Sequence, residues 1–421
     1  MRTLLVNVAD VEGGAARVTQ RLHSEFLRGG IDSRYMVQFA RTDDPRLLSP
    51  SGKLGKLAAR LRPELDSLPL AAYPRATGSL FSPSIIPDGL RRMIRRVNPN
   101  IVHLNWICKG FVRVETVGRI EKPVVWTFHD SWGFTGGCHV PFDCLRYREG
   151  CGRCPQLSSA RAADLSRRVY RRKSRAYRKA GLTVVCPSTW LASCARSSPL
   201  LAGTRIEVIP NGIDTEVFKP LDKAVARRIF GLPPAARIVL FGAMGAVTDR
   251  NKGFRELTEA LSRFSRDWSR GEVLLVVFGS AEPREQPHFG VPTRYVGRLF
   301  DDVSLSVLYS AADVFVAPSR QENLPTTVME AMACGTPTVA FNSSGFPDLV
   351  DHEQSGFLAA AYDPADFARG IAWVLADPLR SRSLGSAARK RVEERFRIED
   401  VARRYLMLYR ELTGQSAENE D

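Results

Sequence analysis

The chain has 421 residues, of which 44% are hydrophobic and 25% are charged. This composition is typical of globular proteins and excludes disorder as the main state, and the length predicts two to three domains. No apolar run approaches the roughly 18 residues that a membrane-spanning helix needs. The first apolar run, Thr3 to Val8, is too short for a signal peptide and is followed by Asp10 and Glu12, so we expect a cytoplasmic protein.

The net charge of +15 is unevenly distributed along the chain. Residues 1–205 contain 34 Lys and Arg against 15 Asp and Glu, a balance of +19, whereas the remainder has 26 against 30. We therefore expect the first half to face an anionic partner. Nucleic acid, acidic lipid headgroups and phosphate-bearing substrates are the three candidates.

Short β-branched segments alternate with helical patterns along both halves. The expected strands are Thr3–Val8, Ser33–Phe39, Ile101–Leu104, Pro123–Phe128, Leu182–Cys186, Ile206–Ile209, Arg237–Phe241, Glu272–Phe278, Arg294–Val296, Asp313–Ala317 and Pro337–Phe341. Near-continuous apolar strands with intervening helices indicate parallel sheets covered on both faces. The sequence therefore predicts an α/β protein with two doubly wound domains, at 1–205 and 206–390, then a helix at 391–414 and a frayed tail at 415–421.

One segment of the first half carries a basic amphipathic pattern. Its apolar positions recur with helical period beside several cations: Leu54, Leu57, Ala58 and Leu61, with Lys53, Lys56, Arg60 and Arg62. Such a helix can lie on an anionic membrane surface. A surface helix that packs this face on its own domain is an equally good interpretation.

Two features of the first half lie where a doubly wound domain binds its ligands, just beyond the carboxyl ends of the strands. Gly13 and Gly14 open a helix, so backbone amides there can approach a phosphate or sugar, although a tight turn also requires glycine. His129 ends the fourth strand and can donate to a substrate hydroxyl, with Asp130 fixing its tautomer. A histidine that is satisfied within the fold is the alternative.

In the second half, Lys252 lies at the start of a helix after the first strand, close to Arg250. A lysine at this point adds a mobile positive charge to a place already suited to anions. A solvated lysine in a turn is the plain alternative.

The strongest signal in the sequence is the segment 318–337. It predicts a strand end, a loop that carries Glu322, a helix that begins near Thr326 or Thr327, and a glycine stop. Free amides at the helix start form a natural diphosphate site, and Glu322 would face the same place. Glu330 has two interpretations, because Thr327-x-x-Glu330 also fits a capping box that would occupy the carboxylate with backbone amides.

Four cysteines lie within 17 residues at the spacing C-x5-C-x6-C-x2-C: Cys138, Cys144, Cys151 and Cys154. Thiols at this density can bind a structural zinc ion, and nearby arginines favour thiolates. The first two spacings are not those of a common zinc ribbon, so reduced thiols or disulfides stay open as alternatives. In each case we expect the four side chains to lie in one neighbourhood.

These motifs together resemble the family 4 glycosyltransferases over nearly the whole chain. Glu322 and Glu330 stand at the E-x7-E spacing of that family, and residues 209–214 are similar to its interdomain signature. Residues 344–348 are similar to its later glycine loop, with Asp348 where Glu is more frequent. The insert with the four cysteines further resembles a bacterial subgroup of the exopolysaccharide or colanic-acid type.

The resemblance implies the GT-B fold, in which two Rossmann-like domains face each other across a cleft and the helix at 391–414 crosses back to the first. It places Glu322 on the transferred sugar, Glu330 on the nucleotide ribose, and His129 near the sugar. It assigns the donor diphosphate to the following residues: Lys252, Asn323, Leu324, Pro325, Thr326, Gly13 and Gly14. The family usually has an arginine at the position of Ala246, and Arg250 is the candidate to replace it.

The implied reaction transfers a sugar from a UDP- or GDP-sugar to a glycan or polyprenyl-linked acceptor, with retention of configuration. A diphosphate oxygen can take the acceptor proton, so positive charge on the leaving group matters most, and the expected catalytic residues are Lys252, Glu322 and His129. No Asp-x-Asp follows a strand, so we expect no catalytic metal or other cofactor, apart from the structural zinc. We expect the chain to act in surface polysaccharide biosynthesis and to bind peripherally to the inner face of the membrane.

Two other classes of function stay open. A nucleotide-sugar epimerase or a phosphorylase can share this fold, and would convert or phosphorolyse its substrate instead of transferring sugar. A nucleic-acid-binding protein would explain the basic half, and residues 161–179 carry nine Lys or Arg with interleaved tyrosines. That segment lacks a recognition motif, so a solvated helical face is the better interpretation and we expect no nucleic-acid partner.

Overall fold

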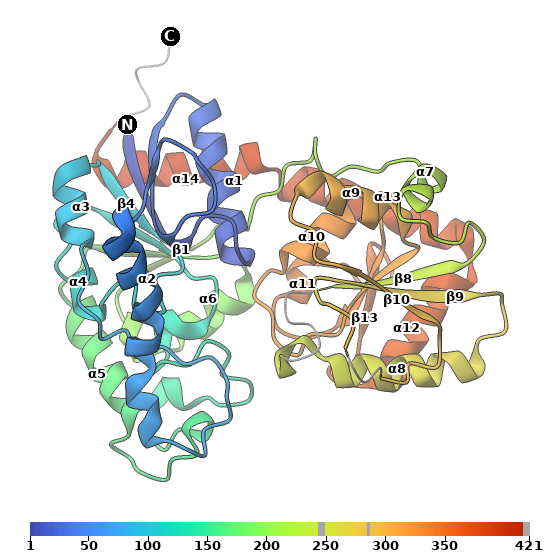
Figure 1. Cartoon of the computed structure of the whole chain (residues 1–421), viewed down its shortest axis with the longest axis horizontal. Coiled ribbons are helices and arrows are strands. Elements are labelled where there is room, and N and C mark those ends of the chain that lie inside the picture. Colours follow the sequence, from blue (N-terminus) through green and yellow to red (C-terminus); the bar gives the residue numbers. More distant parts are fainter. Residues whose placement is uncertain (243–248, 284–286, 416–421) are drawn as a thin grey trace. The chain divides into compact units, whose positions relative to one another are not determined.

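The computed structural model describes residues 1–242, 249–283 and 287–415, and forms two compact units (Figure 1). The first comprises residues 1–210 together with the chain from Val401 onward, and the second comprises residues 211–400. The boundary falls after 210 and not at 205 because the strand at 205–208 pairs with the first sheet.

The first domain is built on a seven-stranded parallel sheet with the strand order β3-β2-β1-β4-β5-β6-β7. Its strands are β1 (Arg2–Ala9), β2 (Asp32–Phe39), β3 (Leu47–Leu48), β4 (Ile101–Leu104), β5 (Val124–Thr127), β6 (Leu182–Cys186) and β7 (Arg205–Val208). Alternate residues of the central strands enter two different cores, so both faces of the sheet are buried.

Helices cover the two faces of this sheet. They are α1 (Gly14–Arg28), α2 (Gly52–Ser67), α3 (Leu90–Val97), α4 (Val114–Val117), α5 (Leu165–Tyr177), α6 (Thr189–Arg196) and α14 (Ile398–Thr413). One core contains residues of α3, α4, α5 and α6, and the other contains Leu22 and Phe26 of α1 with four buried residues of α14 beyond Val401. The last helix of the chain is thus part of the first domain's core.

The second domain repeats the plan with a six-stranded parallel sheet in the order β10-β9-β8-β11-β12-β13. Its strands are β8 (Arg237–Gly242), β9 (Val273–Phe278), β10 (Thr293–Gly297), β11 (Val314–Ala317), β12 (Thr338–Phe341) and β13 (Gly356–Ala359). Its helices are α7 (Lys223–Ile229), α8 (Phe254–Asp267), α9 (Asp302–Ala311), α10 (Thr326–Ala333), α11 (Phe346–Leu349), α12 (Pro364–Ala376) and α13 (Pro378–Arg395). Residues of α9, α10 and α13 lie in one core, and residues of α8 and α12 in the other.

The predicted architecture of two doubly wound, parallel-sheet domains is confirmed. All eleven expected strands are present, and two further strands, β3 and β13, were not predicted from the sequence. β3 has two residues, and β13 has the sequence GFLA, which contains no β-branched residue. The strand order reverses between β1 and β4 and again between β8 and β11, which are the places where such sheets bind ligands.

Helix α2 turns its leucines toward solvent, so the interpretation in which this face packs on its own domain is wrong. A leucine stripe made of four residues of α2 and the one that follows the helix is 45% to 83% exposed: Leu54, Leu57, Leu61, Leu65 and Leu68. The opposite face anchors the helix, because Arg62 donates to the carbonyls of Gly110 and Pro87 and Asp66 accepts from two backbone amides. No helix in the described part of the chain is long and apolar enough to cross a membrane.

A buried hydrogen-bond network joins α14 to the first sheet. His103 on β4 contacts the Tyr409 hydroxyl through Nδ1, at 2.5 Å, and the Thr127 hydroxyl through Nε2, at 2.7 Å. Thr127 in turn contacts the Tyr405 hydroxyl at 2.8 Å. Burial lowers the pKa of His103 to about 3, with a smaller contribution from His129, so the ring is neutral at pH 7.

We predict that the stability of the first domain falls as the pH falls from about 6.5 toward 4. The unfolded chain protonates His103 near pH 6.5 whereas the folded chain does not, so each pH unit in this window costs up to about 1.4 kcal/mol. Denaturant unfolding of the His103→Gln variant at pH 7 and pH 5 should show a shallower pH dependence. His352→Gln, at an exposed histidine, is the control, and an unchanged slope in His103→Gln would contradict the prediction.

Candidate active site

The second domain brings two charged residues together at its switch point, where β8 and β11 lie side by side. Lys252 ends a short 3-10 turn (Arg250–Lys252) that follows β8, and Glu322 lies in the loop after β11. Both therefore project from the carboxyl ends of neighbouring parallel strands. This is the position at which doubly wound sheets bind ligands.

Lys252 and Glu322 form an ion pair with 2.7 Å between Nζ and Oε1. Their side chains are 24% and 18% exposed, so each is shielded and still reachable. Burial would lower the pKa of Lys252, but the charge and hydrogen bond of Glu322, aided by Asp249, outweigh it and raise that pKa. The ammonium is therefore charged throughout the neutral range.

Asn251 holds the two loops at this spacing. Its side chain donates to the Gln321 carbonyl at 2.8 Å and accepts from the Gln321 amide at 3.1 Å, and its own carbonyl accepts from the Arg320 amide. The next residue, Gly253, has φ +67°, and a Cβ there would lie 1.8 Å from the Pro318 carbonyl oxygen. Glycine is required at this position for both conformation and space.

The backbone of Glu322 is held on both sides by the glycine loop. Its amide donates to the Ser344 hydroxyl at 3.0 Å, and its carbonyl accepts from the Gly345 amide at 2.9 Å. A Cβ on Gly345 would lie 1.4 Å from the Asn323 carbonyl oxygen, so the loops touch at backbone distance. The direction of the Glu322 side chain is thereby fixed by the fold.

Helix α10 presents its first amides beside this pair. Its N-cap is Pro325, whose side chain makes no capping hydrogen bond. The Asn211 side chain, from the predicted interdomain signature, donates to the Leu324 carbonyl at 2.9 Å and fixes the loop that leads into the helix. The amides of the first turn, at Thr326 and Thr327, are therefore suited to an anion, together with the positive end of the helix dipole.

The capping-box interpretation of Glu330 is wrong. Thr327 lies inside α10 and not at its cap, so the geometry that a capping box requires is missing. Glu330 is 2% exposed, and its Oε2 accepts from the Tyr309 hydroxyl at 2.9 Å. The carboxylate is used within the core of the domain, and its assignment to a ribose stays a prediction.

The other expected cations differ in placement. Arg250 is exposed at the start of the turn that carries Lys252. Ala246, which stands where the resembled family has an arginine, lies outside the described residues. Arg320 is already engaged, with Glu256 at 2.7 Å and over the ring of Tyr362. Lys252 is thus the cation that the structure places against Glu322.

In the first domain, the expected ligand residues follow β1 and β5, on either side of β4. Gly13 is the N-cap of α1 with φ +95°, and a Cβ on Gly13 or Gly14 would meet open space. His129 is partly buried, and its Nε2 donates to Asn105 Oδ1 at 3.0 Å, which leaves Nδ1 as an acceptor. Burial lowers the pKa of His129 to about 4 against the opposing effect of Asp130, so the ring is neutral.

Asp130 does not orient His129 by the expected hydrogen bond. Its carboxylate accepts instead from His139 Nδ1 at 2.6 Å, from the Trp106 indole at 2.7 Å and from the Trp132 amide at 2.8 Å. Burial would raise the pKa of Asp130, but the charge and hydrogen bond of His139 and these donors lower it. Asn105 is the partner of His129, and Asp130 organises the start of the Cys-rich insert.

Sequence reasoning missed the positioning residues of the second domain. Asn251, Ser344 and Asn211 reach partners that are 70, 22 and 113 residues away along the chain. Asn211 and Ser344 lie within motifs that the sequence had singled out, but nothing local indicates what they contact. The four cysteines line one cavity, as expected.

Two family models match the chain, one in each domain. Residues 12–217 match Glycosyltransferase Family 4, and residues 227–391 match Glycosyl transferases group 1. Together the two matches cover most of the chain, and each falls on one of the two parallel-sheet domains described above, which have the GT-B fold.

The chain is also similar to several characterised proteins. It is 34% identical to D-inositol 3-phosphate glycosyltransferase 2 of Catenulispora acidiphila, over 44% of this chain and 45% of that protein. It is 32% identical to alpha-maltose-1-phosphate synthase of Mycolicibacterium smegmatis, over 52% and 60%, and 27% identical to sulfoquinovosyl transferase SQD2 of Arabidopsis thaliana, over 78% and 59%. The matches thus span about half of each relative's length.

Solved structures share the fold over the full chain. Sucrose-phosphate synthase from Thermosynechococcus elongatus superposes with a TM-score of 0.71 at 21% identity, covering 99% of this chain and 100% of that one. Anabaena HepE, in a complex with UDP and glucose, gives 0.62 at 19% identity, covering 97% and 99%. At these identities the likeness establishes the fold.

We predict that Gly253→Ala destabilises the second domain by about 1–3 kcal/mol, as overpacking does, because its Cβ would overlap the Pro318 carbonyl. Gly297→Ala is the matched control, since Gly297 has a similar φ of +73° and a Cβ there meets nothing within 4 Å. Denaturant unfolding of both variants measures the difference. Equal losses would mean that backbone strain alone, and not the contact between the loops, makes Gly253 necessary.

Proposed function

We propose that this chain, which carries the family 4 and group 1 domains of the GT-B glycosyltransferases, transfers a sugar from a nucleoside diphosphate sugar to an acceptor hydroxyl with retention of anomeric configuration. One observation supports this most directly. The Lys252–Glu322 pair lies at the switch point of the second sheet, and the loop that carries Glu322 leads directly into the start of α10. A cation, a row of amides and a carboxylate suit the diphosphate and the sugar of such a donor.

In the proposed reaction, the bond between the anomeric carbon and the diphosphate breaks, and negative charge grows on the diphosphate oxygens. Lys252 and the α10 amides would stabilise that charge, because preorganised donors act without reorganisation cost. A diphosphate oxygen would take the proton of the acceptor hydroxyl, so the chain needs no general base. Positive charge from the protein itself makes metal-independent chemistry the simplest mechanism.

Glu322 has the geometry to hold the transferred sugar. Its backbone is fixed by Ser344 and Gly345, and its carboxylate is the partner that Lys252 has before a donor arrives. A donor diphosphate would compete for the Lys252 ammonium and leave a carboxylate oxygen for the sugar hydroxyls. His129 of the first domain is neutral and has Nδ1 as an acceptor, and its expected role toward the donor sugar stays a prediction.

The donor and acceptor are proposed from the names of similar proteins and from charge. A solved structure of this fold is described in complex with UDP-glucose, which favours a UDP-sugar. The relatives are named for inositol phosphate, maltose-1-phosphate and sulfoquinovose. An anionic acceptor fits the +19 balance of residues 1–205. We propose a glycan or polyprenyl-linked phosphate acceptor of bacterial surface polysaccharide synthesis.

A lipid-linked acceptor requires the first domain to reach a membrane surface, and α2 has the properties for it. The leucine stripe is exposed along the whole helix, with Lys53, Lys56 and Arg60 also exposed on it. Helix α3 adds four exposed arginines: Arg91, Arg92, Arg95 and Arg96. Apolar side chains flanked by cations bind the interface of anionic bilayers.

We predict that Lys252→Ala weakens the binding of nucleoside diphosphates and slows transfer together, because Lys252 supports the leaving group. Glu322→Ala should leave nucleoside diphosphate affinity nearly intact while transfer falls at least about a hundredfold, roughly 2.7 kcal/mol. Calorimetry and product formation measure the two effects. Lys219→Ala is the matched control, since Lys219 is half-exposed and paired with Glu216 in the same domain.

Wild-type transfer rates in both Lys252→Ala and Glu322→Ala would contradict this assignment of the site.

The Glu330→Gln variant tests the role of Glu330 separately. Lost nucleotide affinity at unchanged stability would indicate a ribose contact, whereas lost stability at unchanged affinity would indicate that Glu330 only supports Tyr309. Conversion or phosphorolysis of the donor without transfer would favour an epimerase or a phosphorylase.

We predict that the chain floats with vesicles that contain anionic lipid and not with neutral ones. The triple variant Leu54→Gln, Leu57→Gln, Leu61→Gln should lose this binding at least tenfold without loss of stability, because the three side chains are 49% to 83% exposed. The matched control is Val225→Gln with Ile229→Gln, two exposed apolar residues of α7 in the other domain. Equal flotation of both variants would show that α2 is not the contact.

A further inference from the structure

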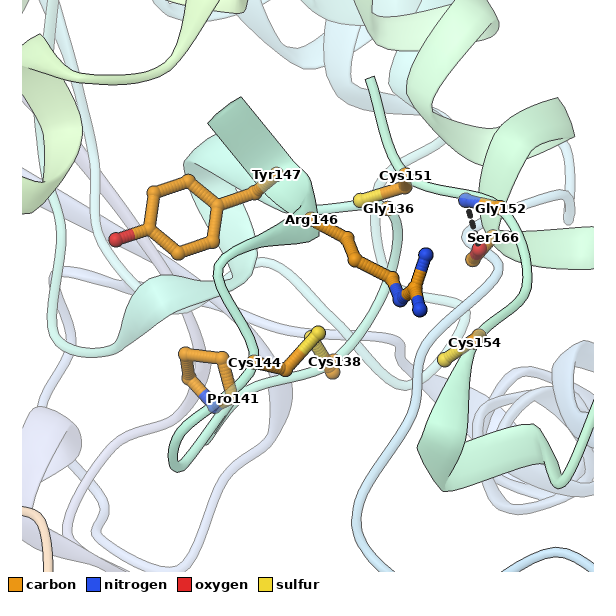
Figure 2. Close-up of a pocket in the computed structure, with 10 residues that line it drawn as sticks. All are labelled: Gly136, Cys138, Pro141, Cys144, Arg146, Tyr147, Cys151, Gly152, Cys154 and Ser166. Carbon is orange, nitrogen blue, oxygen red and sulfur yellow. Dashed lines mark hydrogen bonds between the residues drawn. The ribbon is translucent and has the colours of Figure 1, made fainter. Parts of the chain in front are cut away.

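The Cys-rich insert builds a small cavity that the proposed glycosyl transfer does not use. The cavity is about 20 Å³, large enough for one water-sized guest, and all four cysteines line it together with Arg146 and Ser166 (Figure 2). Cys138 and Cys154 are buried, and Cys144 and Cys151 are partly exposed. The four residues come from different turns of the insert, so the fold itself gathers them.

The four thiols share this one cavity, which is the space that a single bound ion would occupy. They are free thiols and form no disulfide with one another. Four cysteines around one small space are the ligand set of a structural zinc ion, whose positive charge favours the thiolate form.

Hydrogen-bond donors already point at the sulfur atoms. The amides of Gln156 and Leu157 are directed at Cys154, and the amide of Gly136 at Cys151. The Thr135 hydroxyl donates to the backbone carbonyl of Cys138 at 2.6 Å and holds the chain beside that thiol. Amides that face sulfur suit thiolate ligands, which accept hydrogen bonds from the residues around a metal site. The surroundings of the four cysteines therefore suit thiolates, although the cysteines are free thiols in this structure.

A buried lysine next to the cavity gives a second, independent indication. Lys173 on α5 is fully buried, whereas the sequence pattern predicted a solvated face. Its ammonium donates to the carbonyls of Trp132 and Thr135 and lies 3.4 Å from the centre of the Trp132 ring. In the described part of the chain no carboxylate forms an ion pair with it. Burial lowers the pKa of Lys173 to about 7, and the charges that oppose this shift are those of Cys108, Cys138, Cys151 and Asp130. A buried cation of this kind calls for an anionic neighbour.

The backbone around the third and fourth cysteines is strained. Four consecutive residues have positive φ: Gly150 at 89°, Cys151 at 59°, Gly152 at 98° and Arg153 at 47°. Two of these carry side chains, and such conformations persist only where the surroundings impose them. A Cβ on Gly136 would lie 3.0 Å from the Cys151 sulfur, which shows how tightly the turns meet.

We propose that Cys138, Cys144, Cys151 and Cys154 bind one zinc ion as a structural tetrathiolate site, with Lys173 as its buried counter-cation. Binding would displace four thiol protons and leave a net charge of −2, which Lys173 and Arg146 offset. Among the described residues, no three His, Cys, Asp or Glu side chains are arranged so that they could hold a metal ion. Zinc binding would therefore require the four thiols that line the cavity to turn further into it. Four protein ligands leave no open position, which is typical of a structural site.

The test is metal analysis of the untagged, full-length chain purified without chelator. We expect about one zinc per chain, released when a mercurial reagent titrates four thiols. Cys144→Ser and Cys154→Ser should lose at least nine-tenths of the zinc. Cys194→Ser is the matched control, a partly exposed cysteine outside the cluster that should retain it.

Should the cysteine variants fail to fold, cobalt substitution of the unmodified chain replaces them, since a tetrahedral cobalt thiolate has its own visible absorption. Less than about a tenth of an equivalent of zinc with four freely titrating thiols, iron in place of zinc, or a disulfide within the cluster would overturn the proposal. None of these measurements uses an activity, so their outcome is independent of the proposed glycosyl transfer.

Discussion

The candidate site of the second domain depends on how closely three loops approach one another beyond the carboxyl edge of the sheet. Gly253 meets the Pro318 carbonyl and Gly345 meets the Asn323 carbonyl at distances that no Cβ could occupy. Because these contacts are between backbones, they hold the loops more rigidly than side-chain packing would. The 2.7 Å separation of Lys252 and Glu322 is their consequence.

The ion pair also explains how the partly buried charges of this site are stable before a ligand binds. An unpaired buried ammonium or carboxylate is costly, and pairing removes most of that cost. A ligand with an anionic group and hydroxyls can replace this ion pair, because its anion would bind Lys252 and its hydroxyls would bind Glu322. Neither side chain would then be left without a partner. The first domain shows the opposite arrangement, in which Lys173 is buried over the ring of Trp132 and forms no ion pair with a carboxylate of the described residues.

The basic character of the first domain divides into two parts once the structure is considered. Some cations are used inside the fold, as Arg172 is with Glu115 and Arg167 with the carbonyls of the Cys-rich insert. Others remain on the surface of α2 and α3, and on α2 they accompany an uncovered row of leucines. Charge with apolar surface favours a lipid interface over nucleic acid, because base and phosphate recognition makes no use of exposed leucines.

The sequence by itself determined the two parallel-sheet domains, because a buried parallel strand must be apolar along its length and its helices must be amphipathic. It also determined where charged residues would gather, since strand ends in such sheets share one edge. Only the tertiary structure decided that Glu330 binds Tyr309, that Asp130 serves His139 instead of His129, and that the leucines of α2 face solvent. Each of these choices depends on partners far away along the chain, and periodicity and local motifs carry no information about which distant residue lies opposite a given side chain.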